Sequence, residues 1–138
     1  MVIDGVLVAP MVGGVAEVIL GAHVDPVFGP VVMVGVGGTY VEALADVQFL
    51  LPPFDVDDVR RAICRLVFAT IFEGYRGRPP ADVDAWAAAA VQLGEVMAAA
   101  GCPIESIDAN PVILGPRTAG GDGGAVVVDA VVIARRPG

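Results

Sequence analysis

Three oxygen-bearing side chains near the carboxyl end of this chain have the types and spacing of a metal site. Asp108 and Asn110 lie two positions apart in the segment Ile104 to Leu114, and Asp129 interrupts the valine-rich segment Ala125 to Ala134. Carboxylate and amide oxygens are hard ligands, and Mg²⁺ characteristically takes one or two protein carboxylates and completes its octahedron with water and phosphate oxygens. The set therefore suits the binding of a magnesium ion together with phosphates.

Two strands and the loop between them must position these side chains. The glycine-rich run 115–124 can join the flanking segments as a wide antiparallel hairpin. Side chains alternate between faces along a strand, so Asp108 and Asn110 share a face and stand roughly 6.5 to 7 Å apart. If the hairpin pairs symmetrically about its loop, Asp129 lies opposite Asn110 on that same face. The sequence therefore predicts three oxygen ligands that converge.

Asp129 has two interpretations. An unpaired carboxylate in so apolar a run would cost several kcal/mol to desolvate, which favours a bound cation as its partner. Alternatively, this strand has one wet face and Asp129 is simply solvated. A one-residue bulge in either strand would also shift the register and separate Asp129 from Asn110.

The chain as a whole predicts an α+β fold, with a mainly antiparallel sheet covered by helices on one side. Its length suits one domain, residues 1–138. Two β-branched runs around Val12-Gly13-Gly14 predict an opening hairpin, and the turn residues Asp25 to Pro30 lead into a strand apolar enough to be covered on both faces. Besides the carboxyl-terminal hairpin, the expected extended segments are Gly5 to Met11, Val15 to Ala22, Val31 to Val36 and Phe49 to Leu51.

Three helical segments are expected. Tyr40 to Ala45 is short, the second begins after an N-cap at Asp55, and the third begins after Pro80 and stops before Gly101 and Pro103. Spacings of three and four place one apolar stripe on each longer helix, and these stripes are core positions rather than a cofactor site. They comprise Val56, Val59, Ile63 and Leu66 on the second helix, and Val83, Trp86, Ala90, Leu93 and Met97 on the third.

The charge balance argues against nucleic-acid partners. All eight basic residues are arginine, and the formal net charge is −8 with a pI near 4.3, which opposes the attraction to phosphate backbones. Arg60, Arg61 and Arg65 fall on the second helix among aspartates, and Asp57 has the favourable i,i+4 spacing to Arg61. A solvated helix face explains these arginines.

The sequence contains no signal for membrane insertion or export. No apolar run approaches the roughly 18 to 20 residues that cross a bilayer, and the segment Met1 to Gly14 lacks the basic residues of a signal peptide, so we expect a cytoplasmic protein.

Cys64 and Cys102 have neither CxxC spacing nor clustered histidine partners. They are expected to be two buried thiols without a redox or metal role.

An ordered set of motifs carries a resemblance to a known family. The set resembles the C-terminal part of the ATP-grasp domain of acyl-CoA synthetases that form a nucleoside diphosphate, such as ADP-forming acetate-CoA ligase, and more distantly the succinyl-CoA synthetase beta subunit. The resemblance covers nearly the whole chain, and its specificity lies in the order of the segments. These are Gly5 to Met11, Glu17 to Gly21, Asp25 to Met33, Gly35 to Gly38, Gly74 to Pro80 and Asp108 to Pro111.

The resemblance implies roles for the three oxygen donors. In that family the acid and Asn of the DxNP segment, with the Asp of the following strand, gather at magnesium and the nucleotide phosphates. Asp108, Asn110 and Asp129 match these positions, and Asn110 and Asp129 are the expected direct ligands.

The same resemblance implies nucleotide contacts elsewhere. Backbone groups at Val8 and Ala9 would contact adenine, Glu17 would help to bind the nucleotide, and Gly37 and Gly38 would lie near the phosphoryl acceptor. From the residues alone, Glu17 is better explained as a polar residue that alternates on a half-exposed strand.

Two arginines and one histidine are left without a firm role. Arg76 and Arg78 either anchor the turn before the long helix or contact substrate. His23 is the only histidine, and we expect no catalytic role for it.

The implied reaction converts a carboxylic acid, CoA and ATP to acyl-CoA, ADP and phosphate, through an acyl phosphate and a phosphorylated histidine supplied elsewhere. No catalytic residue is assigned to this chain. The phosphate-binding lysines of the family's N-terminal ATP-grasp subdomain are missing, as are its CoA-binding and ligase domains, so these are the expected partners, in cis or in trans. The chain is expected to be inactive alone.

Two alternatives stay open. Relatives usually carry Gln or Glu where this chain has Ala9, which together with the missing subdomain suits a non-catalytic remnant that binds a partner. A different ATP-grasp ligase is the third possibility. The acid substrate and the oligomeric state are not encoded in any motif.

Overall fold

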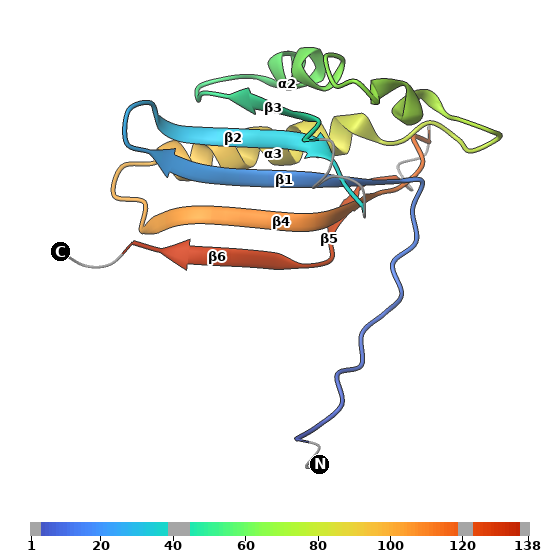
Figure 1. The fold of residues 1–138 in the computed structure, drawn as a ribbon, viewed down its shortest axis with the longest axis horizontal. Coiled ribbons are helices and arrows are strands. Elements are labelled where there is room, and N and C mark those ends of the chain that lie inside the picture. The colour runs from blue at the N-terminus through green and yellow to red at the C-terminus, as the bar shows by residue number, and fades with distance from the viewer. Residues whose placement is uncertain (1–3, 39–44, 119–122, 136–138) are drawn as a thin grey trace.

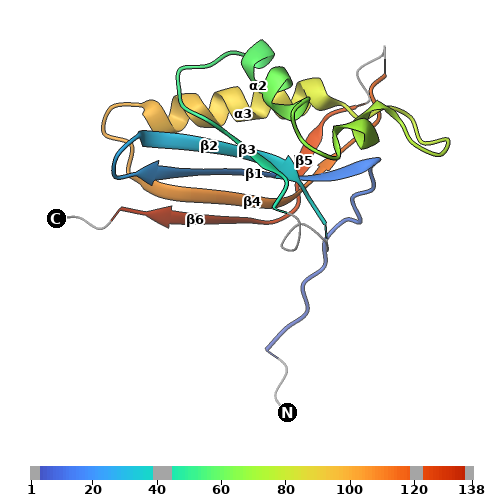
Figure 2. The same ribbon diagram turned by 45° about the horizontal axis from the view of Figure 1, so that its top comes forward.

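A six-stranded antiparallel sheet carries helices on one face in the computed structural model, which describes residues 4–38, 45–118 and 123–135 (Figures 1 and 2). Across the sheet, the strand order is β3-β2-β1-β4, and β5 and β6 both pair with β4 at its far edge. The α+β prediction is confirmed. The strands are β1 (Ala16–Asp25), β2 (Gly29–Val36), β3 (Val47–Leu50), β4 (Ile104–Leu114), β5 (Ala125–Val127) and β6 (Ala130–Ala134).

Two α-helices and one 3-10 helix complete the described part of the chain. They are α2 (Val56–Ile63), η1 (Ala69–Glu73) and α3 (Val83–Ala98). The 3-10 helix was not predicted, whereas α2 and α3 fall where the apolar stripes and caps place them. The expected helix Tyr40 to Ala45 lies outside the described residues except for its last position. None of the helices described combines the length and the apolar character that a membrane crossing requires.

The hairpin of β1 and β2 forms the centre of the sheet. Its turn is closed by Asp25, whose carboxylate accepts the backbone N–H groups of Val27 at 2.8 Å and Phe28 at 2.9 Å. These two hydrogen bonds, that of Phe28 foremost, lower the pKa of Asp25 because they stabilise its charged form. Gly29 then enters β2 with a φ of 75°, a conformation that suits glycine. The turn and third strand predicted from the sequence are confirmed.

The core lies between the sheet and the helices. Alternate residues of β1, among them Val18 and Leu20, point toward the helical layer, and Trp86 of α3 is fully buried against them. Its ring meets Phe72 of η1 edge to face, with centroids 5.6 Å apart. The Trp86 Nε1–H has no hydrogen-bond partner among the described residues. The ring therefore stays in place through apolar packing alone.

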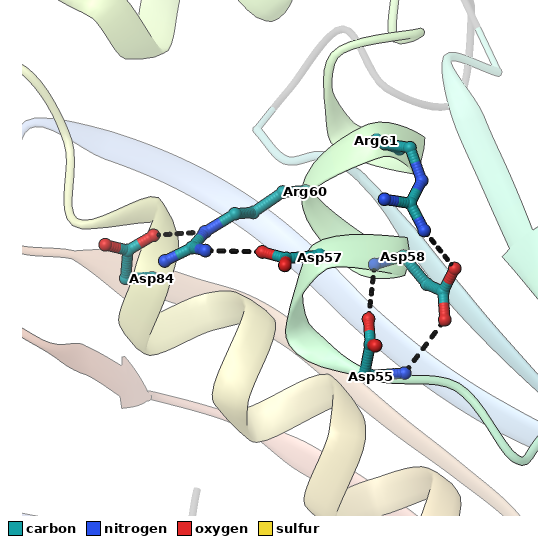
Figure 3. A network of polar contacts seen from close by, with 6 residues as sticks. All are labelled: Asp55, Asp57, Asp58, Arg60, Arg61 and Asp84. Atoms are coloured by element: carbon teal, nitrogen blue, oxygen red, sulfur yellow. Dashed lines mark hydrogen bonds and ion pairs between the residues drawn. The ribbon is translucent and has the colours of Figure 1, made fainter.

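Helix α2 begins with the cap that its sequence predicts (Figure 3). The Asp55 carboxylate accepts the backbone N–H of Asp58 at 2.8 Å, and the Asp58 carboxylate accepts the N–H of Asp55 at 3.0 Å. The latter hydrogen bond is the main cause that lowers the pKa of Asp58, followed by the hydrogen bond from Arg61. The two aspartates thus satisfy two of the N–H groups that a helix start leaves without partners.

The arginines of α2 lie on an exposed face, as predicted, but their pairing differs. The expected ion pair from Asp57 to Arg61 is wrong: Asp57 binds Arg60 at 2.6 Å, and Arg61 binds Asp58 at 2.5 Å (Figure 3). Arg60 also pairs with Asp84 of α3 at 2.8 Å, so its guanidinium lies between the two helices and binds Asp57 at the same time. The two carboxylates raise the pKa of Arg60, Asp84 foremost.

Asp46 is the one buried charged residue among those described, and it joins two distant segments. It stands before β3, and its carboxylate accepts the backbone N–H groups of Val67 at 2.9 Å and Phe68 at 3.0 Å. Those residues form the turn between α2 and η1, which would otherwise bury two N–H groups without acceptors.

We expect Asp46→Ala to lower the free energy of unfolding by about 2–4 kcal/mol, because it leaves two partly buried N–H groups unsatisfied. Urea denaturation followed by circular dichroism measures the change. Asp57→Ala is the control, since it removes an exposed ion pair that contributes at most about 1 kcal/mol. If the two variants unfold at the same urea concentration, the carboxylate of Asp46 does not hold the turn.

The predicted strand Gly5 to Met11 is wrong. Both edges of β1 are occupied, by β2 and β4, so the preceding segment has no edge of β1 to pair with. Residues 4–14 instead leave the sheet as an extended arm (Figure 1), in which the side chains of Val6, Leu7 and Val8 are 85–94% exposed. An apolar strand-forming sequence here has no partner within the described chain.

The prediction of two buried thiols is also wrong. Cys64 is exposed and Cys102 is partly buried, and neither forms a disulfide. Cys64 is the C-cap of α2 and follows the buried Ile63, so it turns toward solvent. Nothing in the surroundings of either cysteine assigns it a chemical role.

Candidate functional site

The predicted site residues of the sheet lie on the face that the helices leave uncovered. Val18, Leu20 and Ala22 of β1 pack into the core, so alternation turns Glu17 and His23 to the opposite face. Figure 2 shows both α2 and α3 on one side of the sheet only. The open face is therefore the surface on which a ligand can reach these side chains.

Strand β4 contributes Asp108 and Asn110 to the same face. Ala109 between them is buried in the core cluster, and Asp108 is opposite Gly21 of β1. A bulge follows, because Ala109 pairs with Leu20 while Val112 pairs with Val18. One residue of β1 therefore opposes both Asn110 and Pro111.

The predicted pairing of Asn110 with Asp129 is confirmed. Ala109 pairs with Ala130 and Val112 with Val127, which leaves Asn110 opposite Asp129, and the N–H of Asn110 donates to the Asp129 carbonyl at 3.1 Å. A bulge of the kind that could have separated Asn110 from Asp129 is present in β4, but it affects the pairing of β4 with β1. Toward β5 and β6 the register is continuous from Ser106 to Leu114, and the one irregularity in that pairing lies between Ile104 and Ser106, away from Asn110.

The predicted single strand Ala125 to Ala134 is divided at Val128 and Asp129, where the partner strand bulges. Val127 and Ala130 both pair with core residues of β4, so the two residues between them are turned away from the core. This arrangement brings Asp129 to the face of Asp108 and Asn110.

The expectation that Asp129 is buried and needs a cation to offset its desolvation is wrong. Asp129 and every residue of β6 are exposed, because this edge of the sheet extends beyond the helices. Water alone can solvate the carboxylate, as the simpler interpretation held. The prediction of a metal site depends instead on the placement of three oxygen donors on one face of the sheet.

The donor set fits a hard divalent cation. The side chains of Asp108, Asn110 and Asp129 form no hydrogen bond or ion pair with any other described residue, so their oxygens are available. Within the described ranges no three His, Cys, Asp or Glu residues gather as ligands. The set has two carboxylates and one amide, which matches the few protein oxygens that magnesium takes.

A pocket of about 670 Å³ opens beside Glu17, at the end of the sheet where the arm joins β1. Glu17 is opposite Ile113 of β4, and its carbonyl accepts the N–H of Gly37 at 2.8 Å. A Cβ at Gly37 would stand 2.7 Å from backbone atoms of Glu17 and Val18, so only glycine fits. The pocket is lined by Val12, Gly13, Gly14, Val15, Ala16, Glu17, Val36, Gly37, Ile71, Tyr75, Arg76, Arg78 and Ile113.

The predicted nucleotide residues are only partly gathered there. Glu17 and Gly37 line the pocket, and Gly38 is adjacent, since a Cβ on it would lie 3.5 Å from Glu17 Oε2. Val8 and Ala9 lie on the exposed arm and do not line it. Their proposed contact with adenine is not tested by this structure.

Sequence reasoning missed one prominent residue of the pocket, Tyr75. The guanidinium of Arg76 lies over the Tyr75 ring, 5.2 Å from its centroid. The signal was present in the segment Gly74 to Pro80, where an aromatic residue is flanked by glycines and arginines. His23 is exposed on the open face opposite Ser106, away from this pocket.

Comparison with known proteins agrees with the fold and the motifs. Residues 1–133 match the family model described as an ATP-grasp domain. The chain is 44% identical over 135 residues to trans-feruloyl-CoA synthase FCS1 of an unknown prokaryotic organism, covering 97% of this chain and 18% of that protein. It is 39% identical over 131 residues to the beta subunit of ADP-forming acetate-CoA ligase II of Pyrococcus furiosus, covering 95% and 54% respectively.

A solved structure of similar fold comes from Ca. Korarchaeum cryptofilum. It is the dinucleotide forming acetyl-coenzyme A synthetase 1 in complex with coenzyme A and Mg-AMPPCP, with a TM-score of 0.79 and 36% identity, covering 92% of this chain and 55% of that one. This chain therefore spans about half of that structure and at most about half of the two relatives named above. The chain belongs to the ATP-grasp family, and its homologues are NDP-forming acyl-CoA synthetases.

Proposed function

We propose that this chain supplies the metal-binding wall of the nucleotide site in an NDP-forming acyl-CoA synthetase. The single observation that carries the proposal is the placement of Asp108, Asn110 and Asp129 on one uncovered face, with their oxygens unoccupied by described protein groups. Asn110 and Asp129 would hold the magnesium ion directly, and Asp108 would stand beside them. The ion, when bound, would neutralise phosphate charge.

Electrostatics explain why the site needs that ion. Glu17, Asp108 and Asp129 are all acidic, the chain carries a net charge of −8 and contains no lysine. Carboxylates repel phosphates, so these residues cannot hold a nucleotide by themselves. Catalysis of phosphoryl transfer is mainly positioning and charge neutralisation, so cationic groups besides the ion are needed around the phosphates.

The remaining residues would position the nucleoside and its phosphates. Glu17 and Gly37 share the pocket at the end of β1, with Gly38 adjacent, and the arm that carries Val8 and Ala9 leaves the sheet at the same place. The exposed apolar side chains of this arm suit contact with a covering segment. The N-terminal ATP-grasp subdomain of the family would be that segment, in cis or in trans.

The complete reaction would convert a carboxylic acid, CoA and ATP to acyl-CoA, ADP and phosphate. The relatives named as ADP-forming acetate-CoA ligases support this class. The phosphorylated histidine and the CoA-binding groups would be supplied by other domains. This chain would contribute no nucleophile, and alone it would be inactive.

Isothermal calorimetry with Mg-ATP tests the proposal, on the chain alone and on the chain combined with the upstream ATP-grasp segment of a relative. We expect weak or no binding by the chain alone and measurable binding when the segment is present. Continued absence of binding in the combined sample would overturn the proposal and would favour a remnant that keeps the fold for partner binding.

A further inference from the structure

Two arginines face the pocket beside Glu17, and no carboxylate of the described residues pairs with them. Arg76 and Arg78 both line this cavity of about 670 Å³. The arginines of α2 behave differently, since Arg60 and Arg61 are each bound to aspartates at 2.5–2.8 Å. Arg65 and Arg117 also lack a carboxylate partner among the described residues, but of the described arginines only Arg76 and Arg78 line this pocket.

The turn that carries these arginines holds them in a defined conformation. Arg76 has a φ of 51°, unusual for a residue with a Cβ, and it is flanked by Gly74 at 93° and Gly77 at 80°. The N–H of Arg78 donates to the Tyr75 carbonyl at 3.1 Å and closes the turn. Backbone strain of this kind tends to persist at sites where it positions functional groups.

Tyr75 orients the Arg76 guanidinium without neutralising it. The cation lies 5.2 Å from the ring centroid, within the range of a cation–π contact. Such a contact leaves the N–H donors at the edge of the guanidinium plane available. These donors match the oxygens of phosphate in geometry as well as in charge.

The balance of charge in the pocket favours an anion. Two guanidinium groups face one carboxylate, that of Glu17, among the lining residues. The other described lining residues are apolar or uncharged. An anionic group can enter here without meeting a second carboxylate.

We propose that Arg76 and Arg78 form a binding site for a phosphoryl dianion in this pocket. Binding of the anion stands on the pocket alone, and its identification as the phosphoryl group in transfer rests on the proposed function. The pocket is next to the oxygen donors along β1. Ile19 of β1 lies opposite Asn110, and Glu17, which lines the pocket, is two residues before Ile19 on the same face. The arginines would thus supply part of the positive charge that the acidic sheet face lacks.

The test is a titration of the full ¹⁵N-labelled chain with inorganic phosphate at constant ionic strength, followed by amide chemical shifts, without magnesium or nucleotide. We expect saturable shifts at Gly13, Tyr75 and Gly77. Arg76→Gln and Arg78→Gln should each weaken phosphate binding by at least about tenfold, since each removes a charge-assisted interaction.

Arg65→Gln is the matched control, because Arg65 is exposed and lies outside the pocket. It should leave phosphate affinity unchanged, and Arg78→Lys should restore part of what Arg78→Gln loses. Absence of saturable shifts in the unmodified chain, or equal weakening by Arg65→Gln, would overturn the anion site. Neither result depends on Mg-ATP binding, so this inference and the proposed function can fail separately.

Discussion

Asp129→Asn and Asn110→Ala are each expected to reduce magnesium-dependent acyl-CoA formation by more than roughly 100-fold. Loss of a residue that only supports a metal ligand costs roughly 10- to 100-fold, and loss of a direct ligand should cost more. The reason is that each variant removes a proposed direct ligand from a set of three oxygen donors. The measurement is acyl-CoA formation as a function of magnesium concentration, by the chain combined with the remaining domains of a relative.

Folding should not confound this result. Asp129 and Asn110 are exposed and their side chains form no hydrogen bond or ion pair with another described residue, so each change should alter the free energy of unfolding by about 0.5 kcal/mol or less. Glu105→Gln is the matched control, an exposed carboxylate on the same strand β4. Unaltered magnesium dependence in both site variants would remove Asn110 and Asp129 from the metal site.

Trp86→Ala is expected to destabilise the fold by about 3–5 kcal/mol, the cost of emptying a large, fully buried aromatic position. Trp86 joins α3 to η1 through Phe72 and packs in the core cluster beneath β1. For a domain whose total stability is of the order of 5–15 kcal/mol, the change approaches unfolding. Urea denaturation followed by circular dichroism is suitable, because the variant lacks the only tryptophan.

Trp86→Phe separates packing from the polar group. This variant should cost clearly less than Trp86→Ala, because it keeps an aromatic ring and removes an N–H that has no partner among the described residues. Val96→Ala on the exposed side of α3 is the control and should change stability by less than about 1 kcal/mol. Equal losses in the alanine and phenylalanine variants would mean that the part of the indole that Phe lacks, and not the aromatic packing that Phe keeps, stabilises this position.

Local signals in the sequence were sufficient for several elements. The cap at Asp55, the apolar stripe of α3 and the turn after Asp25 were all predicted and are present. Each depends on residues within a few positions of one another, so the chain carries the information locally. The hairpin register that pairs Asn110 with Asp129 was also predictable, since its loop centre determines it.

The errors concern interactions between distant residues. Gly5 to Met11 has the composition of a strand, but β2 and β4 occupy both edges of β1. Arg60 pairs with Asp84 across the helix interface, which changed the partner of Asp57. Neither competition can be seen in a single segment.

The sequence by itself therefore determined the fold class, where α2 and α3 begin, and which oxygen donors are candidates for the site, because periodicity, caps and hairpin symmetry act over short separations. Tertiary structure alone decided which face of the sheet is uncovered, that Asp129 is solvated at an edge, and that Arg76 and Arg78 share a pocket with Glu17. The physical reason is that exposure and pocket formation depend on which surfaces the helices cover, and that coverage arises only when segments far apart in the chain pack together.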